Sequence, residues 1–488
     1  MRSKMLKTFD KKLQSIFPKG QFARSVAVLA GGTASAQLMM IAASPILTRL
    51  YTPEDFGLLA VYMSLLSLFT VISSMRYELA IPLPESDQEA AHLTILSLFI
   101  VILITTISGV LIVFVGSYAA KLLGTPKLAN FFWLLPVGVF LVGSYQVFNY
   151  WALRTKSFPT IAKTKIRQTI STVAIQVVGF KLGGITLVIG QAVGQGAGTL
   201  TLGKPAIKRP EFKGWKWVDL KIVAKRYRNF PMFSTWSGFA NTAGMQLPPL
   251  MFAALFSPTI AGFYALAHRV LALPTGLIGG AIGNVFFSNA AEDYRKGRLQ
   301  PLFENVLDKL VMVSIPIMFL LIFAGPTLFE FVFGTDWKQA GIFAQWMAVW
   351  IGMVFISSPL SVLFSVVEKQ AVGLFFQSIM LIVRVIVIFI GYKLDNILLT
   401  IIMFSFSSAI FWFGFLLWAA KQSNSSISFV IKTFMIRVLL TSILTIPLIL
   451  VSLLNVEGLI WWGGLVISAI FLATYIVNDI KKNINYEF

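Results

Sequence analysis

The sequence contains no cysteine and only two histidines, His92 and His268, among its 488 residues. Without thiols, the chain can form no disulfide, thiolate nucleophile or cysteine metal site. Acidic residues are also scarce, 20 against 40 lysines and arginines, and those that enter apolar runs lie near the ends of the runs. A serine triad, a zinc site or a pair of catalytic carboxylates therefore has few residues to build on. The sequence predicts a protein that is not an enzyme and that needs no metal or cofactor.

The sequence is rich instead in apolar residues. They make up 57% of the chain, charged residues make up 12%, and the mean hydropathy is +0.80. A soluble domain cannot bury so much apolar surface, so the expected solvent is a bilayer and the expected fold is an all-α integral membrane protein. Runs of about 20 apolar residues cross a bilayer, and about fourteen are predicted here. They lie near residues 24–48, 56–81, 90–116, 128–152, 158–180, 184–203, 230–256, 260–288, 302–333, 340–367, 371–391, 394–420, 430–453 and 457–477.

The net charge of +20 would suit a nucleic-acid-binding protein, but its distribution has another explanation. Most lysines and arginines lie in the terminal segments and in the even-numbered turns between the predicted spans. An excess of lysine and arginine marks the loops on the cytoplasmic side of a membrane protein. Both termini are therefore predicted to be cytoplasmic, and no nucleic acid is needed as a partner. Arg437 lies inside a span and is expected to extend to the membrane interface.

A short motif occurs twice, 205 residues apart. Residues 50–60 carry Leu-Tyr-Thr-Pro followed by Gly57 and Ala60, and residues 255–265 carry Leu-Phe-Ser-Pro followed by Gly262 and Ala265. Because the offset maps the first span onto the seventh, the sequence predicts two six-helix lobes related by a parallel repeat, plus a C-terminal helix pair. The predicted organisation is an N-terminal lobe over 1–203, a cytoplasmic linker over 204–229, a C-terminal lobe over 230–420, and spans 13 and 14 with a cytoplasmic tail over 421–488.

The predicted linker carries nine lysines and arginines. Apolar Leu220, Ile222 and Val223 lie between them, which favours an amphipathic helix on an anionic leaflet. The alternative is a simple tether whose charges set the orientation.

Arg269 is the most costly residue of the predicted membrane region. It lies within the eighth span, beside His268 and ahead of Pro274, and a cation at this depth costs about 2.5–3.5 kcal/mol. Either an anionic ligand or an ion pair with another helix, for example through Glu78, would supply the missing counter-charge. Glu78 and His268 are also candidates for coupling. Arg24, Arg76 and Arg49 either extend a cationic path for an anionic substrate or anchor their spans at the interface.

Two further patterns point to a transport pathway. Pro45 in the first span and Pro248-Pro249 in the seventh lie at nearly corresponding positions, and Pro274 lies in the eighth. Proline bends a membrane helix, and paired interruptions mark the binding region of many transporters. Polar side chains that either line a cavity or join helices are Asn241, Gln246, Asn284, Gln191 and Gln195. Glycines at 190, 194 and 198 predict a close helix-packing face.

Four segments of the chain carry a family resemblance. They are Leu47-Thr48-Arg49-Leu50-Tyr51-Thr52-Pro53-Glu54-Asp55-Phe56-Gly57, Arg76-Tyr77-Glu78-Leu79-Ala80-Ile81, Gly262-Phe263-Tyr264-Ala265-Leu266-Ala267-His268-Arg269 with Pro274, and Phe333-Gly334-Thr335. In this order they resemble the polysaccharide-transport branch (O-antigen or capsule type) of the multidrug/oligosaccharidyl-lipid/polysaccharide (MOP) exporter superfamily.

The resemblance covers nearly the whole chain and implies a flippase of a bacterial inner membrane. Such proteins move undecaprenyl-pyrophosphate-linked oligosaccharides from the cytoplasmic to the periplasmic leaflet by alternating access, for O-antigen, capsule or exopolysaccharide biosynthesis. Implied partners are the lipid-linked glycan, the bilayer, and a polymerase with other assembly proteins.

The resemblance also implies roles for single residues. Arg24, Arg49 and Arg269 match positions where the related lipid II flippases keep cavity arginines. Where those relatives place acids for sodium, this chain offers Asn241, Gln377, Thr400 and Ser405. The alternatives are a drug or small-metabolite exporter of the same superfamily, which would be expected to place carboxylates deep in its spans, and a membrane polymerase or ligase, which would be expected to need a large outer loop.

Overall fold

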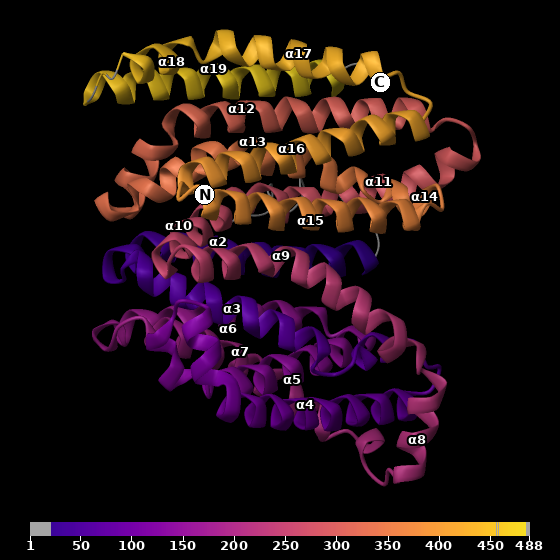
Figure 1. Cartoon of the computed structure of the whole chain (residues 1–488). Helices are drawn as coiled ribbons and strands as arrows, with labels where there is room; N and C mark the ends of the chain where they lie inside the picture. The colour runs from indigo at the N-terminus through magenta and orange to yellow at the C-terminus, as the bar shows by residue number, and fades with distance from the viewer. Residues whose placement is uncertain (1–20, 455, 457, 485–488) are drawn as a thin grey trace, which may run out of the picture. The chain divides into compact units, whose positions relative to one another are not determined.

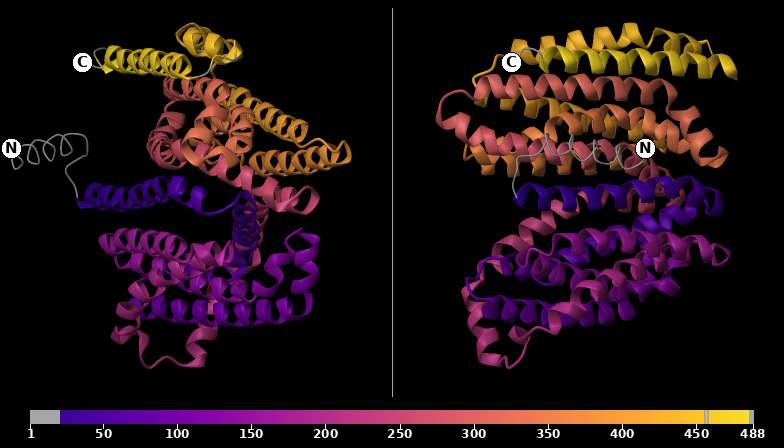
Figure 2. Two further views of the ribbon diagram at one scale, coloured as in Figure 1. Left: turned by 90° about the vertical axis from the view of Figure 1, so that its left-hand side faces the viewer. Right: turned by 180° about the vertical axis from the view of Figure 1, so that it is seen from behind.

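The computed structural model describes residues 21–454, 456 and 458–484, which form helices joined by short turns, with no strand among them (Figures 1 and 2). The contacts divide the chain into two compact units, the first ending at Leu250 and the second beginning at Met251. The all-helical membrane fold expected from the composition is confirmed.

The first unit is a helical bundle in which α5, α6 and α7 make many of the contacts. Helix α6 packs against α2 and α7, and α5 packs against α3, α4 and α7. The helices are α2 (Gln21–Leu50), α3 (Pro53–Ile72), α4 (Asp87–Leu122), α5 (Leu134–Arg154), α6 (Phe158–Val178), α7 (Ile185–Ile207), α8 (Trp217–Arg226) and α9 (Thr235–Leu255), of which α9 ends five residues beyond the boundary. Short helical turns are η1 (Tyr77–Ala80), η2 (Pro126–Phe131), η3 (Phe180–Leu182), η4 (Pro210–Phe212) and η5 (Phe230–Ser234).

The second unit is built on α13, which packs against α10, α12 and α16. Its elements are α10 (Pro258–Leu271), η6 (Thr275–Gly279), α11 (Gly280–Arg295), α12 (Leu299–Phe333), η7 (Thr335–Trp337), α13 (Lys338–Leu360), α14 (Leu363–Val366), α15 (Gln370–Lys393), α16 (Ile397–Gln422), α17 (Ile427–Leu444), α18 (Ile446–Leu453) and α19 (Leu459–Ile484). The last three helices lie along α12, where they are drawn in yellow (Figures 1 and 2).

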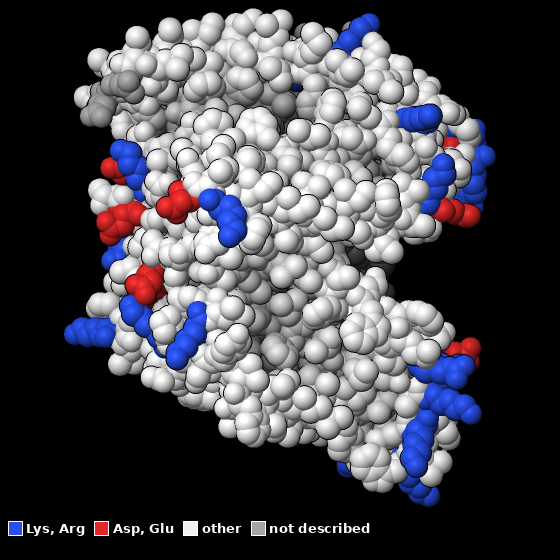
Figure 3. Space-filling model, viewed as in Figure 1, with Lys and Arg blue, Asp and Glu red and all other residues white. Residues whose placement is uncertain are grey.

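Each predicted span coincides with one described helix or with two helices separated by a turn. Among the described residues, nine helices are long and apolar enough to cross a membrane. The predicted spans outside this set are α2, α5, α6, α9 and the pair α10–α11. In Figure 3, the charged residues on the visible face of each unit lie toward the ends of the helices, and the middle carries almost none. This distribution fits an apolar slab flanked by water.

The repeated motif is the start signal of a helix in both copies. The Thr52 hydroxyl accepts a hydrogen bond from the Asp55 amide at 3.3 Å, and the Asp55 carboxylate accepts one from the Thr52 amide at 3.0 Å. In the second copy, the Ser257 hydroxyl accepts from the Ile260 amide at 3.3 Å. A proline follows each cap and fits the first helical position, where no donor is needed. The motif therefore begins α3 and α10.

The predicted prolines lie at two kinds of place. Pro45 lies inside α2, and Pro248 and Pro249 lie inside α9. Pro274 marks a larger interruption, because α10 ends at Leu271 and the chain makes the π-helical turn η6 before α11 begins. The eighth predicted span is thus a broken helix, as expected where backbone donors are lost.

The amphipathic segment α8 uses its apolar face differently from the prediction. Leu220 and Val223 are buried in the core of the first unit, where α8 packs against α4. Of the three apolar residues expected to face a membrane, only Ile222 is exposed, together with Trp217 and Val218. The protein itself covers the other two, because burying them against α4 removes the same apolar area from water.

Arg437 is not a simple interfacial anchor, which corrects the prediction. Its guanidinium donates to both carboxylate oxygens of Asp308 at 2.8 and 2.7 Å and to Asp479 at 3.2 Å, and it contacts the Tyr475 hydroxyl. Lys309 also donates to Asp479 at 3.2 Å. This network fastens α17 and α19 to α12. A fork-shaped cation with two carboxylates suits such a half-buried junction.

Candidate functional site

A polar cavity of about 340 Å³ lies within the first unit, between α2, α5, α6 and α7. Its lining is Thr33, Ala36, Gln37 and Met40 from α2, Tyr145 from α5, Lys165, Gln168, Thr169 and Thr172 from α6, and Gln191 and Gln195 from α7. Three of these four helices, α2, α5 and α6, lie outside the set of nine helices that are long and apolar enough to cross a membrane. Each of the three contributes polar side chains to the lining of this cavity.

Glycines on α7 bring α6 close enough to build one wall of this cavity. A Cβ on Gly194 would lie 1.9 Å from the Thr172 hydroxyl, and one on Gly198 would lie 2.2 Å from the Gln168 amide nitrogen. That amide donates to the backbone and side-chain oxygens of Gln195 at 3.1 and 3.2 Å. The predicted glycine face is therefore a close contact between the two helices, and it fixes the amides at the edge of the cavity.

Lys165 is the only charged residue among the described residues that line the cavity. No hydrogen bond or ion pair of its ammonium group is found within the described part of its unit. The neighbouring cations Lys163 and Arg167 are exposed, whereas Lys165 is half-buried. Residues two apart point to different faces of a helix, but the sequence does not say which face turns inward. The sequence alone therefore did not single out Lys165 as a site residue.

In the second unit, Arg269 lies near the end of α10 and is half-buried. The described residues of this unit place no acidic group within ion-pair distance of its guanidinium. The preceding His268 stacks on Tyr264, with ring centroids 5.8 Å apart, and its ring lies 5.7 Å from that of Trp350. Aromatic packing thus fixes this part of α10, while the cation next to it has no counter-charge among the described residues of its unit.

Arg384 of α15 is a second internal cation of this unit, and it is only 8% exposed. It donates to the Ser408 hydroxyl at 3.0 Å, and its guanidinium lies over the rings of Trp350 and Phe404, at 4.8 and 5.3 Å from their centroids. Cation–π contact stabilises a desolvated arginine by about 2 kcal/mol. Arg384 is therefore held by aromatic faces.

Arg76 and Glu78 lie together in the turn beyond α3, which ends at Ile72. Arg76 has a left-handed backbone with φ of 61°, and its guanidinium lies 3.8 Å from the Glu78 carboxylate. Glu78 is 1% exposed and accepts a hydrogen bond from Ser74. Burial raises the pKa of Glu78, and it outweighs the hydrogen bonds and the Arg76 charge. The structure gives Glu78 these partners within its own unit. A Cβ on Gly238 of α9 would lie 2.5 Å from the guanidinium, so Arg76 also packs on α9.

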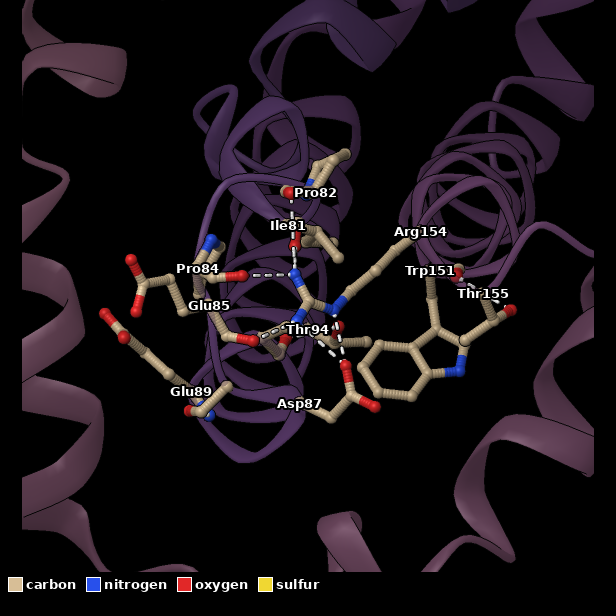
Figure 4. Close-up of polar contacts among 12 residues, drawn as sticks. Ile81, Pro82, Pro84, Glu85, Asp87, Glu89, Thr94, Trp151, Arg154 and Thr155 are labelled. Carbon is tan, nitrogen blue, oxygen red and sulfur yellow. Dashed lines mark hydrogen bonds and ion pairs between the residues drawn. The ribbon is translucent and has the colours of Figure 1, made fainter. Parts of the chain in front are cut away.

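Arg154 clamps the segment that follows Glu78 (Figure 4). From the end of α5 it donates to the carbonyl oxygens of Pro84 at 2.6 Å and Glu85 at 3.2 Å, and to the Asp87 carboxylate at 2.9 Å. Longer contacts of 3.4 Å reach the carbonyls of Ile81 and Pro82. One guanidinium thus holds the whole turn between η1 and α4, which uses all sides of its planar fork.

Three further predicted site residues lie on α2 and α9. Arg49 donates to the Pro45 carbonyl of its own helix at 2.7 Å, and Gln246 accepts a hydrogen bond from Ser64 at 3.0 Å. Asn241 is exposed on α9. The side chains of Arg24 and Asn284 lie outside the described residues. Within the described part of the chain, no group of three histidine or acidic residues could hold a metal ion.

The fold is that of MOP superfamily transporters. The structure of a lipid II flippase, MurJ, in an inward closed conformation covers 93% of this chain and 99% of its own, with 15% identity and a TM-score of 0.73. An inward-facing multidrug resistance MATE family transporter covers 80% of this chain and 94% of its own, with 13% identity and a TM-score of 0.64. A MOP superfamily transporter from Pyrococcus furiosus covers 82% and 95%, with 13% identity and a TM-score of 0.54.

The family is given by the sequence itself. Residues 46–342, more than half of the chain, match the model of the family described as polysaccharide biosynthesis protein. The chain belongs to this family. No curated protein matches it by sequence. The resemblance to the polysaccharide-transport branch of the MOP superfamily is thereby confirmed.

Proposed function

We propose that this protein is a flippase for undecaprenyl-pyrophosphate-linked oligosaccharide repeat units. It carries them from the cytoplasmic to the periplasmic leaflet of a bacterial inner membrane by alternating access, for the synthesis of a surface polysaccharide, and both of its termini are cytoplasmic. The observation that carries the proposal is Arg269, a half-buried cation on α10, in the eighth predicted span, with no acidic partner in the described part of its unit. The polysaccharide biosynthesis family and the transporter fold support it.

The pyrophosphate is the part of the substrate that such a cation recognises. A guanidinium presents a planar set of donors that binds phosphate oxygens in pairs. An unpaired cation in a membrane helix costs about 2.5–3.5 kcal/mol, and a bound anion offsets this cost. In the proposed role, Arg269 holds the pyrophosphate while other polar side chains contact the sugars.

The membrane potential can supply the direction of transport. With the cell interior negative, one negative charge that moves outward gains about 2.3 kcal/mol per 100 mV. A pyrophosphate that crosses with only part of its charge neutralised by Arg269 would use this gain.

Charge reversal at Arg269 tests the proposal in cells that lack the native gene. Arg269→Glu should abolish surface polysaccharide while the protein still reaches the membrane, because the new carboxylate repels the pyrophosphate. Arg295→Glu is the matched control, since Arg295 is exposed at the end of α11 and its reversal should leave transport intact. Normal polysaccharide with Arg269→Glu would overturn the proposal.

An exporter of drugs or small metabolites is the second candidate, and the likeness of the fold to a MATE transporter favours it. Deletion of the gene separates the two. Loss of surface polysaccharide with unchanged drug sensitivity supports the flippase, and the reverse supports the exporter.

A further inference from the structure

We propose that the cavity between α2, α5, α6 and α7 binds an acidic saccharide, with the anionic group of the sugar at Lys165. The ligand class is a sugar residue that carries a carboxylate or a phosphate substituent. This inference rests on the proposed function and deepens it, because it says which kind of repeat unit the protein prefers. The residues that line the cavity belong to the first unit, whereas Arg269 belongs to the second.

The charge of the cavity requires an anion. Lys165 is half-buried, and among the described residues that form the lining it is joined only by neutral side chains. The described acids of the first unit lie in turns or near helix ends, such as Asp87 at the start of α4 and Glu89 in its first turn. An ammonium group partly removed from water is stabilised by an anionic partner with hydrogen-bonding oxygens. The ligand supplies that partner.

The neutral groups of the lining suit sugar hydroxyls. Gln37 and Gln191 have amides that form no hydrogen bond within the described part of the chain, and the buried Tyr145 hydroxyl also lacks a partner there. Each amide offers two hydrogen-bond donors and an acceptor, and a hydroxyl can both donate and accept a hydrogen bond. The Tyr145 hydroxyl is buried, so a ligand that pairs it is favoured, because leaving it unpaired costs free energy. Gln37 is exposed and Gln191 is half-buried, so their amides can exchange water for sugar hydroxyls. Hydrocarbon or an aromatic drug would not pair these groups.

The size and position of the cavity fit this role. About 340 Å³ lies within the range of small-molecule sites, about 300–1,000 Å³. Lys165 lies in the first half of α6, and the turn between α5 and α6 is predicted from the distribution of lysine and arginine to be cytoplasmic. The sugar would enter from the side on which a repeat unit is made.

Ligand-observed NMR on the purified full-length protein in nanodiscs tests the inference. The probes are a disaccharide that contains a hexuronate, the same disaccharide with its carboxylate reduced to the alcohol, and inorganic pyrophosphate. The variants are Lys165→Gln and the control Lys163→Gln, whose side chain is exposed two residues away on the same helix. Loss of a charge-assisted hydrogen bond corresponds to about a tenfold change in affinity.

The inference predicts that Lys165→Gln weakens the hexuronate disaccharide about tenfold, leaves the weak binding of the reduced disaccharide unchanged, and does not alter pyrophosphate binding. Lys163→Gln should match the wild type with all three probes. Equal binding of the two disaccharides by the wild type, or an unchanged affinity in Lys165→Gln, overturns the inference. Loss of pyrophosphate binding in Lys165→Gln also overturns it, because Lys165 would then bind the pyrophosphate of the lipid carrier and not the acidic group of the sugar. The proposed function has its own test, since normal surface polysaccharide in cells with Arg269→Glu would overturn it whatever the outcome at Lys165.

Discussion

The crossing of α2 and α6 gives the sharpest test of the packing that builds the cavity. Gly32 of α2 faces Ala162 of α6, and a Cβ on Gly32 would lie 2.4 Å from the Cβ of Ala162 and 2.8 Å from its Cα. A Cβ on the adjacent Gly31 would meet no atom within 4 Å. The two glycines therefore form a matched pair in the same helix, and only one of them is required by a close approach.

The magnitudes of the two substitutions follow from these distances. Replacing a helical glycine by alanine favours the helix by about 1 kcal/mol, so Gly31→Ala should be stabilising. Gly32→Ala has the same favourable helix propensity, but its new methyl group would force α2 and α6 apart. Such overpacking costs about 1–3 kcal/mol. The two variants should therefore differ by about 2 kcal/mol, or about 2 °C in the melting temperature of a chain of 488 residues.

Thermal unfolding of the purified variants, followed by the loss of the monodisperse peak in size-exclusion chromatography, measures this difference. Gly32→Ala combined with Ala162→Gly should recover part of the loss, because one of the two clashing carbons is removed. Gly32→Ala should also weaken binding of the acidic disaccharide, since the neighbouring Thr33 lines the cavity. Equal melting temperatures for Gly31→Ala and Gly32→Ala, without rescue by Ala162→Gly, would refute the close crossing.

Three other predictions concern charged groups away from the cavity. Asp308→Asn should destabilise the protein by about 3 kcal/mol, because it leaves Arg437 without its main partner, and protease cleavage after α16 should quicken. Arg154→Lys should raise hydrogen exchange in residues 81–87 at least about tenfold, because an ammonium group cannot hold several carbonyls and Asp87 at once; unchanged exchange would contradict the clamp. The pKa of Glu78 is raised by burial, so the folded protein holds this proton more tightly than the unfolded chain. Stability should therefore fall as pH rises from the ordinary glutamate pKa through the folded one, and Glu78→Gln should remove that loss in melting curves recorded between about pH 4.5 and pH 8.

The sequence was sufficient for the helices because their signals are local. Runs of apolar residues, the caps Thr52 and Ser257 and the glycine face of α7 each depend on residues within a few turns. The repeated motif is a helix cap in both copies, which the hydroxyl-proline pair already indicates.

The site depended on contacts that hydropathy does not contain. Lys165 lines a cavity because of the way α6 turns against α2 and α7, and the sequence shows only three cations in the first half of one span. Arg437 finds its partner 129 residues away at Asp308, so the sequence could not separate an ion pair from an interfacial anchor. Arg269 was identified because a cation in a long apolar run is costly wherever it faces.

Translocation by the purified protein in proteoliposomes tests the central claim most directly. A fluorescently labelled polyprenyl-pyrophosphate oligosaccharide is placed in both leaflets, and a quencher that cannot cross the membrane reports the outer pool over time. The wild type should make the inner pool accessible, and Arg269→Glu should slow this at least about a hundredfold, since a lost charge pair costs about 3 kcal/mol or more. Translocation at the wild-type rate by Arg269→Glu, or none by the wild type, would contradict the assignment of the pyrophosphate to Arg269.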